Sequence, residues 1–317
     1  MTGGDRQVFN NRTINKNAAP LNGDRARIQG EDTRKVKAPD FAYERPESLD
    51  QVFDLLERHG DEARILAGGQ SLLATLNMRL SSPGLLVDIG RVPGLAGVAR
   101  AGQTIRIGAM TRHCDLAAAP PVQAHLPLLA RAVPHIAHPA IRNRGTIGGS
   151  VALADPAAEL PACCLAMGAT MVLASRGGER RVAAADFFQG LFRTVLEPHE
   201  LLAAIEVPVP PAGSVAGFDE LARRHGDYAI VGLAAQGVPA GAGWQGLALA
   251  FFGADDRPVL ATAAAAVLAE GGGIAAAQAA LDRDLDPPGD LNGDPATKRH
   301  LARVLLGRVV GAMAEGR

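Results

Sequence analysis

Two glycine pairs, each followed closely by a hydroxyl residue, are the segments of this sequence best suited to bind a ligand. The first lies in Ala67–Leu73, which reads Ala-Gly-Gly-Gln-Ser-Leu-Leu, and the second lies in Thr146–Ser150, which reads Thr-Ile-Gly-Gly-Ser. Adjacent glycines let backbone N–H groups approach a ligand without a Cβ in the way, and successive N–H groups turned inward bind phosphate oxygens. One such loop is a weak signal, whereas two in one chain indicate a ligand with two phosphates, as in a dinucleotide.

Two carboxylates follow the second glycine loop. Asp155 and Glu159 lie in Asp-Pro-Ala-Ala-Glu-Leu-Pro, and the prolines at 156 and 161 predict a short turn or helix that keeps both side chains near the loop. Paired carboxylates can perform general acid–base catalysis, and they can equally accept hydrogen bonds from the ribose or ribityl hydroxyls of a ligand. Helix capping or solvation explains Asp155 equally well, whereas the apolar surroundings of Glu159 favour a functional role.

The residue types give little support to other chemistries. The cysteines are Cys114, Cys163 and Cys164. An odd count with two adjacent residues is no disulfide framework, which favours a reducing, cytoplasmic location. Three thiols also fall short of the four that usually hold an iron–sulfur cluster. We expect Cys163 and Cys164 to be buried thiols, and the sequence contains no convincing catalytic triad or metal site.

Length and composition limit the class of protein. The chain has 317 residues, of which 47% are hydrophobic, and a formal net charge of −1. This length suffices for two domains with separate cores. The balanced charge argues against nucleic acid as a partner, and no apolar run approaches the length of an integral membrane segment.

The elements around the first glycine loop are expected to alternate between helix and strand. Ser48 is a candidate N-cap for a helix with an apolar face, and Gly60 follows the end of this helix. The expected elements are a helix over 49–59, a strand over 64–67, a helix over 72–80, and strands over 85–89 and 104–109. The first glycine loop therefore connects a strand to a helix, where phosphate-binding loops commonly occur.

The second half of the chain continues this mixture and then changes domain. We expect a helix over 126–142, strands over 171–174 and 203–207, paired strands over 228–235 and 247–252, and helices over 261–281 and 295–314. A Pro/Gly-rich run over 208–217 marks the domain boundary. Gly241–Gly246 has the G-x-G-x-x-G spacing of a Rossmann loop, but a strand-like segment follows it in place of the required helix. We interpret it as a hairpin turn.

Residues 1–35 differ from the rest of the chain. They are rich in Asn, Asp, Arg, Gly and Thr and contain almost no periodic apolar residues. Such a segment buries too little surface to offset its ordering entropy. It also lacks the apolar stretch of a secretory signal. We expect a disordered or partner-contacting extension.

Several of these segments together resemble one known family. Residues 66–73, 143–150 and 155–161 are similar to the FAD-binding (medium) subunit of molybdenum hydroxylases, which include xanthine dehydrogenases and carbon monoxide dehydrogenases. Residues 223–231 and 286–301 extend the resemblance, which covers about 36–315 in the family's order.

The resemblance implies an α+β fold. Residues 36–212 would form a two-part, PCMH-type FAD-binding domain, with a small α/β subdomain over about 36–95 and a larger mixed-sheet subdomain over 96–212. Residues 213–317 would form a smaller α+β C-terminal domain, in which a β-sheet packs on helices.

The resemblance also implies a set of cofactor-binding residues and no catalytic side chain. The first loop would wrap the FAD pyrophosphate, and the second would hold its other side and the ribityl chain. The implied contacts are Leu66, Ala67, Gly68, Gly69, Gln70, Ser71, Leu72, Ile107, Thr146, Ile147, Gly148, Gly149, Ser150, Glu159 and Leu202. Ile107 would lie against the flavin or the adenosine, and Leu202 would pack near the isoalloxazine. Many relatives have Asp at Glu159 and Asn at Ser150, and a flavin-contacting Lys of some relatives is missing from 218–221.

The chemistry implied by the resemblance is electron transfer. Substrate would be hydroxylated at a molybdopterin cofactor on a large subunit, and electrons would pass through two [2Fe–2S] clusters on a small subunit to FAD on this chain. The expected assembly is a dimer of heterotrimers. Two alternatives are a free-standing FAD-dependent oxidoreductase with its own substrate pocket, and a scaffold subunit that has lost flavin. An exposed apolar surface would be the footprint of the partner subunits.

Overall fold

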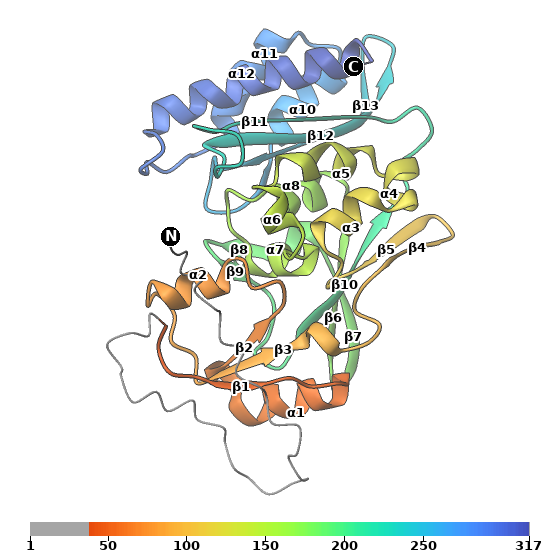
Figure 1. Ribbon diagram of the computed structural model, residues 1–317. Coiled ribbons are helices and arrows are strands. Elements are labelled where there is room, and N and C mark those ends of the chain that lie inside the picture. The colour runs from red at the N-terminus through yellow and green to blue at the C-terminus, as the bar shows by residue number, and fades with distance from the viewer. Residues whose placement is uncertain (1–37, 317) are drawn as a thin grey trace, which may run out of the picture.

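The computed structural model describes residues 38–316, and its N-terminal part is a small parallel sheet packed against one helix (Figure 1). The strands run in the order β1 (Ala42–Glu44), β3 (Leu85–Asp88), β2 (Ala63–Leu66). The predicted helix is confirmed as α1 (Leu49–His59), and the Ser48 hydroxyl accepts a hydrogen bond from the Gln51 N–H at 3.3 Å. The predicted extension over 1–35 lies outside the described residues.

The helix predicted after the first glycine loop is confirmed but is shorter than expected. It is α2 (Leu72–Asn77), which connects through an extended segment to β3. Two 3₁₀ turns complete this part of the chain, η1 (Gly60–Glu62) before β2 and η2 (Ile89–Arg91) after β3. The first glycine loop therefore leaves the carboxyl end of a parallel strand, which lies at the edge of the sheet and is only partly buried.

A five-stranded antiparallel sheet forms the second layer. Its order is β4 (Val98–Ala101), β5 (Thr104–Gly108), β10 (Leu201–Pro208), β6 (Thr170–Ser175), β7 (Gly178–Ala183). The central strand β10 is buried on both faces. Leu202, Ile205 and Val207 belong to the main core, whereas Leu201 and Ala203 pack with the helix and strands of the small parallel sheet. Strand β10 thus joins the two parts of the N-terminal half.

Short helices cover the main-core face of this sheet. They are α3 (His113–Ala118), α4 (Pro120–His125), α5 (Pro127–Ala132), η3 (Val133–His135), α6 (Pro139–Arg142), α7 (Ile147–Leu153) and α8 (Glu159–Ala166). The prediction of one helix over 126–142 is wrong. Pro134 and Pro139 lack a backbone N–H and divide the segment into three helical turns with different directions. The connection after α8 and β7 adds α9 (Ala184–Phe187), β8 (Phe188–Gly190) and β9 (Arg193–Thr194).

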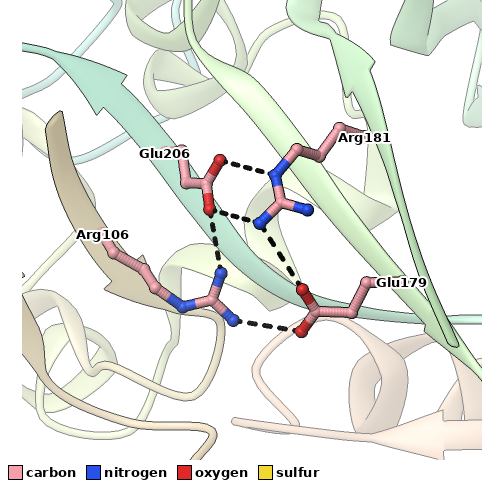
Figure 2. A network of polar contacts seen from close by, with 4 residues as sticks. All are labelled: Arg106, Glu179, Arg181 and Glu206. Carbon is pink, nitrogen blue, oxygen red and sulfur yellow. Dashed lines mark hydrogen bonds and ion pairs between the residues drawn. The ribbon is translucent and has the colours of Figure 1, made fainter. Parts of the chain in front are cut away.

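A network of charged side chains crosses the solvent face of the five-stranded sheet (Figure 2). Glu206 accepts bonds from the Arg181 guanidinium at 3.0 Å through both carboxylate oxygens, and Arg106 Nη1 bonds the same carboxylate at 3.1 Å. Glu179 lies 3.4 Å from Arg106 and 3.6 Å from Arg181. The Arg181 guanidinium bonded to Glu206 lowers the pKa of that carboxyl. The arginines are exposed, so solvent screens these pairs and their contribution to stability is small.

The C-terminal part is a four-stranded antiparallel sheet, with strands in the order β11 (Val215–Leu221), β12 (Val231–Ala240), β13 (Gly243–Phe252), β14 (Val259–Leu260). Side chains on one face, such as Val231 and Leu233, pack against the C-terminal helices. Side chains on the other face, such as Ala234 and Phe252, join the main core. On this face the sheet lies against α5 and α8 (Figure 1). Burial of both faces explains why these strands have continuous apolar sequences without alternation.

Three helices and one turn cover the outer face of this sheet: α10 (Thr262–Ala269), α11 (Ile274–Ala280), η4 (Leu281–Arg283) and α12 (Pro295–Ala314). The final predicted helix is confirmed as α12. The single helix predicted over 261–281 is wrong, because the glycines at 271–273 end α10 and start α11 in a new direction. The Rossmann-like spacing over 241–246 is confirmed as part of a hairpin, in which Ala240 pairs with Gly243.

Candidate flavin-binding site

A cavity of about 620 Å³ lies where the glycine loops meet. Its walls include the loop between β2 and α2, helix α7 with the segments on either side, and the loop before β12. The segment after β5, the turn between β8 and β9, and the start of β10 also contribute. The volume is within the usual range of small-molecule and cofactor sites, about 300 to 1,000 Å³. The predicted site residues that line it are Ala67, Gly68, Gly69, Gln70, Ser71, Leu72, Thr146, Gly148, Gly149, Ser150, Glu159 and Leu202.

Three predicted contacts do not line the cavity. Ile107 and Ile147 are fully buried in the main core, and Leu66 is the last residue of β2, beside the lining residues Ile65 and Ala67. Ile107 alternates along β5 with the solvent-facing Arg106, so its side chain packs beneath the sheet surface that bears the helices. These isoleucines support the cavity wall from behind.

The first glycine loop presents a row of free hydrogen-bond donors. Within the described chain, no acceptor bonds the backbone N–H groups of residues 68, 69, 70, 71 or 72. Gly69 has a φ of +72°, a conformation that favours glycine, and the Gln70 side chain donates to the Gly68 carbonyl at 2.9 Å. Consecutive N–H groups in such a turn form a concave anion site. We define this row, residues 68–72, as the phosphate loop.

The second glycine loop has a different role, because its N–H groups are already bonded. The Ile147 N–H donates to Thr111 O at 3.0 Å, and the Gly148 N–H donates to Ala109 O at 2.8 Å. The Thr146 hydroxyl caps α7 by accepting from the Gly149 N–H at 3.1 Å. This loop therefore offers the cavity the hydroxyl of Ser150 and a close packing surface, and few free backbone donors.

Glycine is required at 68 because the two loops are in contact. A Cβ built on Gly68 would lie 2.4 Å from the carbonyl oxygen of Arg144 and 2.8 Å from Cα of Gly145. Both atoms are backbone and cannot rotate away. The sequence suggested that the glycines make room for a ligand, whereas at this position the glycine makes room for the other loop.

Three carboxyl groups and a histidine cluster beside the cavity. Asp155 and Glu159 line it, and Glu220 on β11 lies behind, with one carboxylate oxygen 3.5 Å from Nδ1 of His135. Burial raises the pKa of Asp155 and raises the pKa of Glu159 to about 7, to which the Glu220 charge also contributes. The hydrogen bond to Glu220 raises the pKa of His135. Asp155 also accepts a hydrogen bond from the Ala157 N–H at 2.9 Å. Its side chain therefore stabilises a local turn and also lines the cavity.

The raised pKa of Glu159 predicts a pH dependence of stability. The folded protein holds this proton between pH 4.5 and about 7 while the unfolded chain has lost it, so the free energy of unfolding falls as pH rises through this window. We expect Glu159→Gln to remove at most about 3 kcal/mol of this decrease in the FAD-free protein. Asp155 and His135 have raised pKa values too and preserve part of the slope.

Urea unfolding of wild type and variant at several pH values from 5 to 8 measures this effect. Glu270→Gln, at an exposed position at the end of α10, is the matched control and should retain the wild-type slope. An unchanged slope in the Glu159 variant would contradict the assignment of the titration to this residue.

Several cavity residues were not among the predicted contacts. Gly226, Asp227 and Tyr228 come from the loop before β12, and Phe192 comes from the turn between β8 and β9. Gly226 has a φ of +86°. The segment 223–231 carried part of the family resemblance, which was the one available signal. Its place in the cavity depends on packing of the C-terminal sheet against α5 and α8, which local sequence patterns do not specify.

Two of the three cysteines are core residues. Cys163 and Cys164 are fully buried in α8, as predicted, and burial raises the pKa of Cys164 to about 12. Within residues 38–316, no group of three His, Cys, Asp or Glu side chains is placed to hold a metal ion. No helix in this range is long and apolar enough to cross a membrane.

The phosphate loop, the carboxylates and the apolar cavity are suited to a dinucleotide, and comparisons with known proteins show which family the chain belongs to. Residues 39–210 match the FAD-binding domain in molybdopterin dehydrogenase, and residues 216–313 match the C-terminal domain of the CO dehydrogenase flavoprotein. The chain belongs to the family of FAD-binding subunits of molybdenum hydroxylases, which are oxidoreductases, and the resemblance stated from the sequence is confirmed.

Similar proteins cover most of the chain. The carbon monoxide dehydrogenase medium chain of Afipia carboxidovorans is 36% identical over 277 residues, which are 85% of this chain and 95% of that protein. The 6-hydroxypseudooxynicotine dehydrogenase complex subunit alpha of Paenarthrobacter nicotinovorans is 50% identical over 63% of this chain and 67% of its own length. A carbon monoxide dehydrogenase structure from Hydrogenophaga pseudoflava superposes with a TM-score of 0.85 at 38% identity, covering 88% of this chain and 98% of that chain.

Proposed function

We propose that this chain is the electron-transfer flavoprotein subunit of a molybdenum-containing hydroxylase complex. It would take electrons from [2Fe–2S] clusters of a partner subunit and pass them to an external acceptor. The observation that carries the proposal is the phosphate loop, whose N–H groups have no acceptor in the described chain and line an apolar cavity. The chain also matches the model of an FAD-binding domain. FAD held in this cavity would supply the electron-transfer chemistry, and the residues of the chain would bind and orient it.

The residues of the cavity would hold the cofactor without taking part in bond making. The phosphate loop would bind the pyrophosphate through charge-assisted hydrogen bonds. Glu159 and Asp155 would accept hydrogen bonds from ribose or ribityl hydroxyls. The apolar wall that includes Leu202 and Ile136 would pack against the ring systems and exclude water.

The same proposal includes the partners. The chain has three cysteines, and a [2Fe–2S] cluster usually takes four thiolates, so the clusters would belong to a small subunit. The molybdopterin cofactor would belong to a large subunit, in a dimer of heterotrimers located in the cytoplasm. Relatives named as medium chains or as subunits of dehydrogenase complexes support this composition.

An apolar rim beside the cavity supports a docking site for the small subunit. Leu73, Met78 and Leu80 are exposed on α2 and the turn after it, with Met78 at 62% and Leu80 at 73%. Leu191 and Phe192 are exposed on the turn between β8 and β9. Leu72 of α2 and Phe192 line the same cavity, so the two exposed groups border one opening. Exposed apolar side chains gathered in this way mark interaction surfaces, and this one adjoins the expected flavin.

Charge introduced into this rim should prevent assembly without loss of cofactor. We expect the double variant Met78→Glu/Leu80→Glu to retain FAD at the wild-type level, because neither side chain lines the cavity, and to lose co-purification with the iron–sulfur partner. Leu291→Glu is the matched control, since Leu291 is 95% exposed in the loop before α12. Recovery of the full complex with the double variant would show that the partner docks elsewhere.

The proposal as a whole is tested by purifying the tagged chain from its own cells, followed by a visible spectrum and metal analysis. Flavin, iron and molybdenum together with two further polypeptides would support the electron-transfer subunit. Flavin alone, with turnover of a small molecule by the isolated chain, would indicate the free-standing oxidoreductase. A colourless protein without absorbance near 450 nm would indicate a scaffold.

A further inference from the structure

His113 is a buried imidazole in the wall of the cavity. It is the first residue of α3, its side chain lines the cavity, and it is 5% exposed. Neither Nδ1 nor Nε2 has a hydrogen-bond partner within the described chain. A buried polar atom without a partner destabilises a fold, so an imidazole without partners in a cavity wall points to a partner supplied from inside the cavity.

The ring is neutral at physiological pH. Burial lowers the pKa of His113 to about 4. The Thr146 backbone, which faces the ring outside hydrogen-bond distance and angle, raises the pKa in part, and the positive charge of Arg142 lowers it by a smaller amount. A neutral imidazole carries one N–H donor and one nitrogen acceptor. His113 can therefore donate to a ligand oxygen without placing a buried charge in the wall.

The position of the ring relates it to the phosphate loop. The His113 backbone N–H donates to Gly145 O at 2.9 Å, and a Cβ built on Gly145 would lie 3.0 Å from Cε1 of His113. Cα of Gly145 also lies 2.8 Å from a Cβ built on Gly68. Gly145 therefore lies next to both the imidazole and the first residue of the phosphate loop.

We propose that His113 is a cofactor-binding residue whose ring donates a hydrogen bond to the diphosphate portion of FAD. The phosphate loop would bind the diphosphate through backbone N–H groups, and His113 would add a side-chain donor from the cavity wall beside Gly145. The inference rests on FAD binding in this cavity. It does not depend on the partners or on electron transfer. The experiment below also measures FAD binding by the wild type, so failure of this inference can be told from failure of FAD binding.

Nitrogen NMR of the histidine rings tests the contact in the unaltered protein. Protein labelled with ¹⁵N-histidine is stripped of cofactor and titrated with FAD and, separately, with ADP, which carries the diphosphate without flavin. We expect both ligands to shift the His113 ring nitrogens, assigned through the loss of their signals in His113→Phe. Signals that FAD leaves unchanged would overturn the proposal, and signals that FAD but not ADP shifts would overturn the diphosphate assignment.

Affinity measurements on variants give a second readout. Loss of one hydrogen bond to a charged group predicts that the Kd for FAD rises about 10- to 100-fold in His113→Phe. His113→Gln, which restores a donor of similar reach, should recover most of the affinity. His300→Phe, on the exposed side of α12, is the control and should bind as wild type does. Thermal unfolding of the cofactor-free variants shows whether they are folded. A folded His113→Phe variant with wild-type affinity would overturn the proposal.

Discussion

Replacing Gly68 with alanine is expected to abolish retention of FAD through purification. The added Cβ would lie 2.4 Å from the Arg144 carbonyl oxygen, so the two glycine loops must separate. Separation of the loops changes the directions of the N–H groups in the phosphate loop, so that they no longer point together at the diphosphate. Loss of alignment of two charge-assisted hydrogen bonds, each of about 1.5–3 kcal/mol, predicts that the Kd for FAD rises at least about 100-fold.

The measurement is the ratio of flavin absorbance to protein after gel filtration, followed by titration with FAD. Gly311→Ala is the matched control, because a Cβ at that position in α12 has no neighbour within 4 Å. The control should retain FAD fully. Stoichiometric flavin in Gly68→Ala would show that the contact between the loops does not govern cofactor binding.

Replacing Gly148 with valine should destabilise the protein itself. A Cβ at this position would lie 2.4 Å from the Cβ of Ala109 and 2.7 Å from its carbonyl oxygen, which accepts the Gly148 N–H. The clash separates α7 from the segment after β5 in the main core. Overpacking of this kind costs about 3 kcal/mol, which corresponds to a decrease in Tm of about 6–12 °C for a domain of this size.

Thermal unfolding of the cofactor-free protein is the appropriate measurement, because it separates stability from ligand binding. Gly311→Val provides a valine in an uncrowded position and should unfold within about 2 °C of wild type. A Gly148 variant with wild-type Tm would mean that α7 can move without cost. It would also indicate that glycine is needed at position 148 to make room for a ligand and not for packing against Ala109.

The sequence alone determined the features that depend on local pattern. The cap at Ser48, the strand before the first glycine loop, the hairpin over 241–246 and the final helix follow from residue type and spacing, and each is found in the structure. The family and its cofactor were also evident from the two loops and the segment 155–161, because these segments keep their order and spacing.

Only the tertiary structure decided which of the two glycine loops has backbone N–H groups free to bind a ligand. In the sequence they are equivalent, whereas in the fold the N–H groups of α7 are bonded to Thr111, Ala109 and Thr146, and those of the phosphate loop have no acceptor in the described chain. The structure likewise placed His113 in the cavity wall and Ile107 in the core. Hydrogen-bond partners far apart in the chain are chosen by packing of whole elements, so residue type and spacing specify which groups can bind a ligand but not which remain free to do so.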